Sequence, residues 1–244
     1  DGGSSTTTTT VTLSAAFTAT PAASTTVTIA GQTFTLLVQP YQVAVPAGVS
    51  PGEKFTVPLP DGREPEVECP PGVGPGGYVM VPAELGIGGQ AAVFLGVSST
   101  GERVAVKVFF AKAVDAAPRE LHFLEGLQSH ENGIRYLGAA QIAGPLPPAH
   151  SLSGIVSPSG IVMDHAEGGD FMGYVIELKV HLSPLDPAGA RFFFLQMVAG
   201  VKHAHARGVV LCDLKPDNML LLDESCRQLL LADYGMAHHR AEVP

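Results

Sequence analysis

The stretch from Gly208 to Leu222 constrains this chain more than any other, because it places charged and amide side chains in a short loop between two apolar runs. Within it, Lys215 lies two residues and Asn218 five residues after Asp213. Pro216 lies between them and cannot continue a helix, so the chain must turn there. A carboxylate can accept a hydroxyl proton, an ammonium can bind a phosphoryl oxygen, and an amide oxygen can ligate a hard cation. Together these groups indicate phosphoryl transfer.

The composition narrows the class of protein. The chain has 244 residues, 45% of them apolar, which is enough for one large or two small domains with packed cores. Its formal net charge of −9 favours neither nucleic acid nor an anionic membrane as a partner. Three cysteines without C-x-x-C spacing argue against a disulfide framework and a structural zinc site. No apolar run approaches the roughly 20 residues that span a bilayer. We therefore expect a reducing compartment, the cytoplasm or the nucleus.

Two segments are expected before the catalytic-type region. Residues 1–30 are rich in Thr, Ser and Ala and are predicted to be flexible and of low complexity, with short strand character at Thr25 to Thr28. Residues 31–83 contain two units at a period of 24 residues, in which Val45 to Pro58 matches Cys69 to Pro82. Each unit joins a P-x-G-V-x-P-G turn to an alternating strand, which predicts a small antiparallel β module. We interpret this module as a spacer or a protein-binding module.

The pattern changes at Glu84. Leu85 to Val93 forms a glycine-rich turn between two strands, where the backbone can approach phosphate groups closely. In the next strand, Arg103 to Phe110, Ala105 and Lys107 lie on one face because strand side chains alternate. That face suits a pocket in which a base stacks over the alanine and the ammonium meets phosphates.

Two helices and a hairpin are predicted further along the chain. The first helix begins at Pro118 and carries leucines at three-residue spacing. The second runs from Asp186 to about Ala206 and is apolar nearly all round, so we expect it to be buried. The hairpin joins Met219–Leu222 to Gln228–Ala232 and ends directly before Asp233.

These features resemble the eukaryotic protein kinases. The catalytic loop of that family reads H-R-D-x-K-x-x-N, and Leu211 to Asn218 reads LCDLKPDN, with a Lys-Pro pair similar to the serine/threonine branch. V-A-V-K ending at Lys107 is similar to V-A-I-K, and D-Y-G beginning at Asp233 resembles D-F-G. The resemblance covers about Glu84 to Arg240. It implies an α+β, protein-kinase-like fold: a β-rich N-terminal lobe and the beginning of a helical C-terminal lobe, forming a partial kinase domain over residues 84–244 after the all-β repeat module.

The resemblance also implies catalytic roles. Asp213 would position the substrate hydroxyl, and Lys215 would stabilise the transferred phosphoryl group. Lys107 would orient the phosphates of ATP while paired with a glutamate of the first helix. Glu120 matches that glutamate best, and Glu125 is the alternative.

A further set of residues would bind ATP and Mg²⁺ by the same resemblance. Asn218 and Asp233 would hold Mg²⁺. Backbone groups of Asp164 and Ala166 would hydrogen-bond adenine, and Asp170 would reach the ribose. The other nucleotide contacts would come from the glycine-rich turn, the strand after it, the gatekeeper position and the hairpin: Leu85, Gly86, Ile87, Gly88, Val93, Ala105, Lys107, Met163 and Leu220.

The implied function is a serine/threonine protein kinase that transfers the γ-phosphoryl group of ATP to protein hydroxyls. Three departures support an alternative, a pseudokinase or a scaffold. Gln90 and Ala91 alter the tip of the glycine-rich turn, and Leu211 and Cys212 replace the His and Arg of H-R-D. The sequence stops at Pro244, before an activation segment, so we expect a fragment with little activity of its own.

Overall fold

The computed structural model of the chain contains two compact units. The repeat unit is built on Val38–Ala83, and the larger unit on Ser24–Leu37 together with Glu84–Pro244. The residues described are 25–38, 40–59, 63–81, 83–110, 113, 115–127, 130–143, 156–181 and 183–242. Among them, no helix is both long and apolar enough to cross a membrane.

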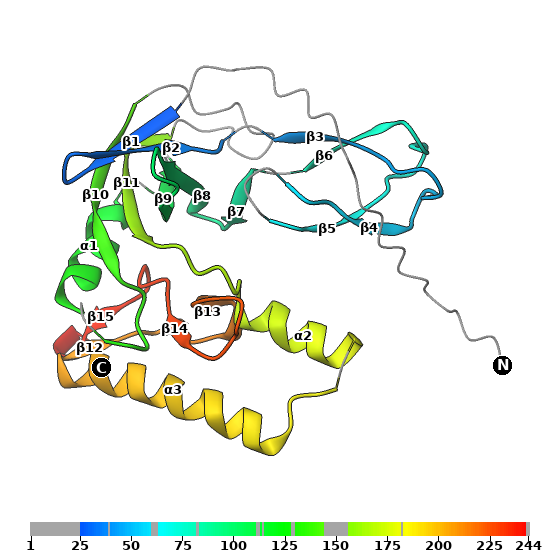
Figure 1. Ribbon diagram of the computed structural model, residues 1–244. Helices are drawn as coiled ribbons and strands as arrows, with labels where there is room; N and C mark the ends of the chain where they lie inside the picture. The colour runs from blue at the N-terminus through cyan, green and yellow to red at the C-terminus, as the bar shows by residue number, and fades with distance from the viewer. Residues whose placement is uncertain are drawn as a thin grey trace. The chain divides into compact units, whose positions relative to one another are not determined.

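The repeat unit consists of two antiparallel strand pairs. Its strands are β3 (Tyr41–Ala44), β4 (Lys54–Thr56), β5 (Glu66–Glu68) and β6 (Tyr78–Val81). β3 pairs with β6, and β4 pairs with β5 (Figure 1). Alternate residues, among them Val43, Phe55 and Val79, point into one shared core. The all-β module that the repeat pattern predicted is present.

The two repeats pair with each other instead of folding separately. Ala44 lies opposite Tyr78, and the positions related to these by the period of 24 residues, Glu68 and Lys54, also lie opposite each other. The turns of this unit require backbone conformations with positive φ, which glycine adopts without strain. The turn glycines with positive φ are Gly48 (91°), Gly52 (86°), Gly72 (83°) and Gly76 (80°).

The larger unit begins with an antiparallel sheet of seven strands. They are β1 (Thr25–Ile29), β2 (Gln32–Leu36), β7 (Glu84–Ile87), β8 (Ala91–Ser98), β9 (Arg103–Phe110), β10 (Tyr136–Ala143) and β11 (Val156–Asp164). Their order is β2-β1-β10-β11-β9-β8-β7, and β2 pairs with β8 as well. That additional pairing closes six of the strands into a barrel, which leaves β7 on the outside.

The first two strands correct the division expected from the sequence. Residues 25–37 were expected to lie partly in a flexible segment and partly in the repeat module, but they form a hairpin of the larger unit. Val27, Phe34 and Leu36 alternate with threonines and are 1%, 3% and 3% exposed, so the hairpin buries one apolar face. Ala30 and Gly31 both have positive φ, which suits a two-residue hairpin turn. Residues 1–24 of the expected flexible segment lie outside the described residues.

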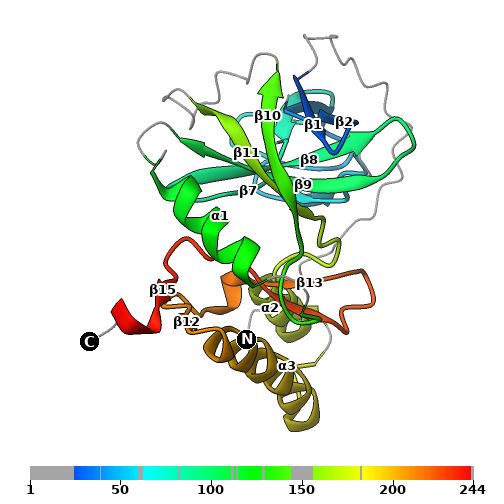
Figure 2. The same cartoon turned by 90° about the vertical axis from the view of Figure 1, so that its left-hand side faces the viewer.

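The rest of the larger unit is mainly helical. Its helices are α1 (Ala116–Gly126), α2 (Phe171–His181) and α3 (Pro187–Ala206), with short 3₁₀ turns η2 (Pro216–Asn218) and η3 (Arg240–Glu242). Its short strands are β12 (Val209–Val210), β13 (Met219–Leu221), β14 (Leu229–Leu231) and β15 (His238–His239). α3 begins where expected, because the Asp186 carboxylate accepts the Gly189 N–H at 2.7 Å and Pro187 occupies the first helical position. α1 lies against the barrel, with the other helices farther from it (Figure 2).

The prediction that α3 is buried on all sides is wrong for the described residues. Phe193, Gly200 and Ala204 are buried, and this side of the helix packs on β14 and β12. The opposite side is exposed: Phe192 is 47% exposed, Phe194 61%, Leu195 53% and Val198 44%. An apolar sequence on all sides of a helix does not determine how many of those sides pack against other elements.

β9 is buried on both faces, which explains its apolar run. Val104, Val106 and Val108 share the face that alternation predicted, with exposures of 1%, 0% and 1%. Ala105 and Phe109 lie on the other face, in the core cluster that also includes residues of α1, α3 and the β13–β14 hairpin. The face that carries Lys107 is therefore directed toward the helical part of the unit.

Candidate active site

The glycine-rich turn lies between β7 and β8, as predicted. Gly86 pairs with Val93, and the Gly88 N–H donates to the Ala91 carbonyl at 2.9 Å, which closes the turn. The turn reaches toward the D-Y-G segment, because a Cβ atom built on Gly235 would lie 3.9 Å from the Gln90 side-chain oxygen. The Gln90 side chain at the tip of the turn therefore lies near the D-Y-G segment.

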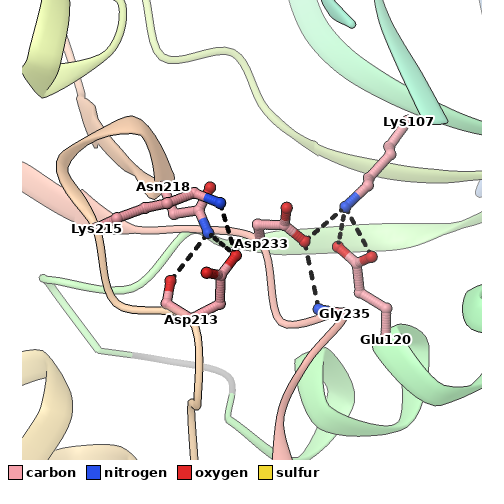
Figure 3. A network of polar contacts seen from close by, with 7 residues as sticks. All are labelled: Lys107, Glu120, Asp213, Lys215, Asn218, Asp233 and Gly235. Atoms are coloured by element: carbon pink, nitrogen blue, oxygen red, sulfur yellow. Dashed lines mark hydrogen bonds and ion pairs between the residues drawn. The ribbon is translucent and has the colours of Figure 1, made fainter. Parts of the chain in front are cut away.

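A buried ion pair connects β9 to α1. The Lys107 ammonium lies 2.8 and 2.7 Å from the two carboxylate oxygens of Glu120, whose side chain is 2% exposed (Figure 3). The same ammonium lies 2.9 Å from Oδ1 of Asp233. Of the two glutamates considered from the sequence, the structure brings Glu120 to the lysine, and Glu125 is exposed on another face of α1.

Burial and charge act in opposite directions on this pair. Burial lowers the pKa of Lys107, but the carboxylates of Glu120 and Asp233 outweigh it, so the pKa is raised above its ordinary value. Burial raises the pKa of Glu120, and the Lys107 ammonium opposes this rise. Each charge is therefore stable only because the other is present.

The loop from Asp213 to Asn218 forms a second cluster. The Lys215 ammonium lies 2.9 Å from Oδ2 of Asp213, and the Asn218 amide donates to the same oxygen at 2.8 Å and to the Asp213 carbonyl at 3.0 Å (Figure 3). Pro216 begins the 3₁₀ turn η2 and no longer helix follows. The hydrogen bond from Lys215 lowers the pKa of Asp213, partial burial opposes it, and Asn218 adds to it. Asp213 is consequently ionised near neutral pH.

The β13–β14 hairpin brings the two clusters together. Met219 pairs with Leu231, so the residues just outside this pair, Asn218 and Ala232, meet at the open end of the hairpin. The Ala232 N–H donates to the Asn218 carbonyl at 2.9 Å, and Asp233 follows directly. Asn218 and Asp233 thus come to the same place although 15 positions separate them.

Two residues beside the carboxylates have left-handed backbone conformations. Cys212 and Asp233 both have φ of 59°, a region that few residues other than glycine adopt. Asp233 compensates in part, because its Oδ1 accepts the Gly235 N–H at 3.3 Å. Such strained positions persist where surrounding structure fixes them, commonly at functional sites.

The oxygen atoms at the end of the hairpin suit a hard divalent cation. Asn218 uses its NH₂ group on Asp213, which leaves Oδ1 without a hydrogen bond to any described residue. Oδ2 of Asp233 likewise has no hydrogen bond within the described part of the chain, and this side chain is 45% exposed. A carboxylate and an amide oxygen with open approach are the donors that Mg²⁺ accepts, usually together with water.

Five of the predicted nucleotide-contacting side chains gather in one cluster, whereas Ile87 is 49% exposed and lies outside it. Ala105 lies opposite Met163 in the sheet, and both are in the main core cluster. Leu85, Val93 and Leu220 are partly buried against the same cluster. Apolar side chains from before and after the β11–α2 connection in sequence thus lie in one cluster.

That connection also supplies backbone groups. The Asp164 N–H donates to the Arg135 carbonyl at 3.1 Å, so only its carbonyl could contact a base. The Ala166 N–H makes no backbone hydrogen bond within the described residues. Asp170 was expected at the ribose; its Oδ1 accepts the Gly173 N–H at 2.8 Å and thereby caps α2, which leaves Oδ2 for a ligand.

Sequence reasoning missed two other features of this region. The Arg135 guanidinium binds the Asp164 carboxylate with two nitrogens, the shortest contact being 2.7 Å, and so fixes the β10–β11 end of the connection. Tyr234 is 5% exposed and donates to the Leu231 carbonyl at 3.1 Å. Burial raises the pKa of Tyr234. An aromatic residue inside D-Y-G was the one available sequence signal for the second feature.

A β-rich lobe with a glycine turn and a buried Lys–Glu pair, facing an Asp–Lys–Asn loop and an Asp-Tyr-Gly segment, defines the protein kinase class of fold. The protein kinase domain family model matches residues 80–242, and the chain belongs to this family. The predictions of a protein-kinase-like α+β fold and of this family are confirmed.

Curated relatives agree with the family. Hormonally up-regulated neu tumor-associated kinase of Mus musculus is 32% identical over 167 residues, 67% of this chain and 21% of the relative. A probable serine/threonine-protein kinase of Dictyostelium discoideum is 33% identical over 76 residues, 31% of this chain and 8% of the relative. Maternal embryonic leucine zipper kinase of Danio rerio is 31% identical over 156 residues, 62% of this chain and 20% of the relative. The aligned residues span about a fifth of these relatives' length or less.

Proposed function

We propose that this protein is a serine/threonine protein kinase that transfers the γ-phosphoryl group of ATP to protein hydroxyl groups. The observation that carries the proposal is the Lys107 ammonium, held between Glu120 and Asp233 beside an ionised Asp213. A buried cation costs desolvation energy, and its position between two carboxylates near a glycine-rich turn supports a site that binds phosphate groups. The Lys-Pro pair in the catalytic loop and the name of the Dictyostelium relative support the serine/threonine assignment.

Asp213 and Lys215 would act on the two ends of the reacting group. The Asp213 carboxylate is charged at neutral pH and one-third exposed, so it can accept a hydrogen bond from a substrate hydroxyl and orient its oxygen. Lys215 already lies at that carboxylate, 2.9 Å away, and its ammonium has donors left for a phosphoryl oxygen. Asn218 keeps Asp213 in place through one hydrogen bond to its carboxylate and one to its backbone carbonyl.

Lys107, Asn218 and Asp233 would hold the phosphates and the metal. Mg²⁺ at this site would neutralise negative charge on the phosphates. Asn218 Oδ1 and Asp233 Oδ2 are the oxygens that would hold it, and Lys107 would contact phosphate oxygens while Glu120 keeps its ammonium in position. The adenine ring would lie in the apolar lining around Ala105 and Met163.

The proposal is tested with the purified chain and with a longer product of the same reading frame if one exists. Phosphate transfer from ATP and Mg²⁺ to a serine/threonine-containing protein should fall by at least about a hundredfold in Asp213→Asn. The matched control is Asp217→Asn, because Asp217 is exposed in the same loop and its side chain makes no hydrogen bond to Asp213 or Lys215 among the described residues; it acts on Lys215 through its charge alone. Equal transfer by both variants would refute the role of Asp213.

A second candidate is a kinase-like protein that binds nucleotide or protein without phosphoryl transfer. The observation that favours it is Leu211, which takes the place of the H-R-D histidine, is 6% exposed and has a side chain that cannot form hydrogen bonds. The repeat unit would then supply the protein-binding surface. Nucleotide binding that shifts the melting temperature in the wild type and in Asp213→Asn alike, without transfer in either, would support this candidate.

A further inference from the structure

An arginine of α1 contacts the segment after D-Y-G. Arg119 donates from Nε and Nη2 to the Ala237 carbonyl at 3.2 and 2.8 Å, and its Nη2 also lies 2.7 Å from Nε2 of His238. Arg119 directly precedes Glu120, so the two side chains leave adjacent positions of the helix. Figure 2 shows α1 beside β15, which itself pairs with β12.

The contact with His238 requires a neutral ring. A guanidinium can only donate hydrogen bonds, so Nε2 of His238 must accept one and its proton must reside on Nδ1. Protonation of the ring would remove the acceptor and set a cation against the arginine. The carboxylate of Glu242 lies 3.8 Å from Nδ1 of His238 and would attract the protonated ring away from Arg119.

A second histidine contact joins the same two elements. Nε2 of His122 on α1 lies 3.0 Å from Nε2 of His239 on β15, so one ring donates and the other must be neutral to accept. The His239 ring also packs on Phe123, with centroids 5.1 Å apart. Two protonated rings would direct two N–H groups at each other and repel.

The other groups around this contact do not offset that loss. β12 contributes Val209 and Val210 opposite β15, and neither side chain is charged. Glu242 is the acidic residue within ion-pair distance of these rings among the described residues, and it favours the protonated form of His238. At the other end of α1, His203 lies 3.3 Å from the Leu127 carbonyl, and burial lowers its pKa.

We propose that Arg119 is a positioning residue for Glu120, and that protonation of His122, His238 and His239 weakens the contact between α1 and β15. With neutral rings, the α1–β15 contact holds α1 where Glu120 reaches Lys107. With protonated rings, two of the contacts between α1 and β15 are lost, whereas the hydrogen bonds from Arg119 to the Ala237 carbonyl and the Lys107–Glu120 pair remain, so α1 is held less firmly. The effect on phosphoryl transfer rests on the proposed function, whereas the loosening of α1 does not.

The test is hydrogen–deuterium exchange of the full 244-residue chain at pH 7.5 and pH 5.5, corrected for the intrinsic pH dependence of exchange. Relative to β8 in the same sample, we expect exchange in α1 and β15 to increase at pH 5.5 by about tenfold for each hydrogen bond lost. The triple variant His122→Gln, His238→Gln, His239→Gln should show no such increase. A glutamine amide can replace Nε2 as acceptor or donor and does not titrate in this range.

Two further variants separate the proposal from general acid instability. The control is His205→Gln, an exposed histidine of α3, which should respond to acid as the wild type does. Arg119→Lys keeps the charge but loses the fork that grips the Ala237 carbonyl, so α1 should exchange faster at both pH values. An increase that persists in the triple variant, or that also disappears in His205→Gln, would overturn the proposal.

Exchange and catalysis fail in distinguishable ways. If exchange follows the expectation and no phosphate transfer occurs at any pH, the pH-dependent contact between α1 and β15 is supported and the proposed kinase function fails. If transfer occurs and α1 exchange in the wild type does not change between the two pH values, the kinase function is supported and the pH dependence of this contact is refuted.

Discussion

Removing the cation at the centre of the site should destabilise the larger unit by an amount that depends on pH. In Lys107→Met, the Glu120 carboxylate would remain 2% exposed without a charged partner. Leaving one member of a buried ion pair alone typically costs about 3 to 5 kcal/mol. The carboxylate can limit this cost by taking up a proton, which from its ordinary pKa of 4.5 requires about 3 kcal/mol at pH 7 and about 1 kcal/mol at pH 5.5. We therefore expect a loss of about 3 kcal/mol at pH 7.

The sign of the pH dependence follows from linkage. In the variant, the folded state holds a proton on Glu120 at pH values where the unfolded state has released it, so the variant gains stability relative to the wild type as pH falls. Urea unfolding followed by far-ultraviolet circular dichroism measures this, because all three helices described belong to the larger unit. The double variant Lys107→Met, Glu120→Gln should recover most of the loss at pH 7.

The result that would refute this reasoning is equally specific. A loss below about 1 kcal/mol at pH 7 would mean that the Glu120 carboxylate is well solvated without Lys107. A loss that grows toward pH 5.5 would mean that protonation of the carboxylate is not the compensating process. A double variant no more stable than Lys107→Met would place the damage in packing instead of charge.

Three further predictions address the loops and the hairpin. Lys215→Ala should raise the pKa of Asp213 toward its ordinary value, which NMR titration of the carboxyl group measures. In the wild type the lowered pKa stabilises the folded state above about pH 4, and this contribution is lost as the pH falls. Cys212→Gly should be neutral or stabilise by up to about 1 kcal/mol, because φ of 59° suits glycine, whereas Cys212→Val should destabilise in the same urea assay. Phe34→Ala should cost about 3 to 5 kcal/mol in the unfolding of the larger unit, because its side chain is 3% exposed; a loss below 1 kcal/mol would contradict membership of the hairpin in that unit.

The sequence was informative wherever local pattern and residue chemistry agreed. Strand alternation predicted that Lys107 and Ala105 lie on one face. Asp186 and Pro187 correctly predicted where α3 begins. The choice of Glu120 over Glu125 also followed from a local match and is the one that the geometry brings to Lys107. These are features that a few neighbouring residues determine.

The features that could not be predicted depend on partners far along the chain. The sequence pattern divided the β1–β2 hairpin between the threonine-rich segment and the repeat module, because the strands that pair with it, β10 and β8, lie far along the chain; Thr26 pairs with Ala143. The contact of Arg119 with Ala237 spans 118 residues, and no spacing in the sequence marks it. The exposed face of α3 likewise follows from which elements lie beside it, and composition alone does not tell that.

The strand pairing of the barrel also explains how the larger unit can contain the repeat unit as an insertion in its sequence. The repeat unit lies in sequence between β2 and β7, and both of these strands pair with β8. The Leu37 N–H donates to the Leu95 carbonyl at 2.9 Å, and Glu84 lies opposite Phe94, so both ends of the insertion are held at adjacent residues of one strand. An insertion whose ends are already close adds little strain to the fold that receives it. β7 leads directly into the glycine-rich turn, so the strand that ends the insertion is also the strand that begins the candidate nucleotide site.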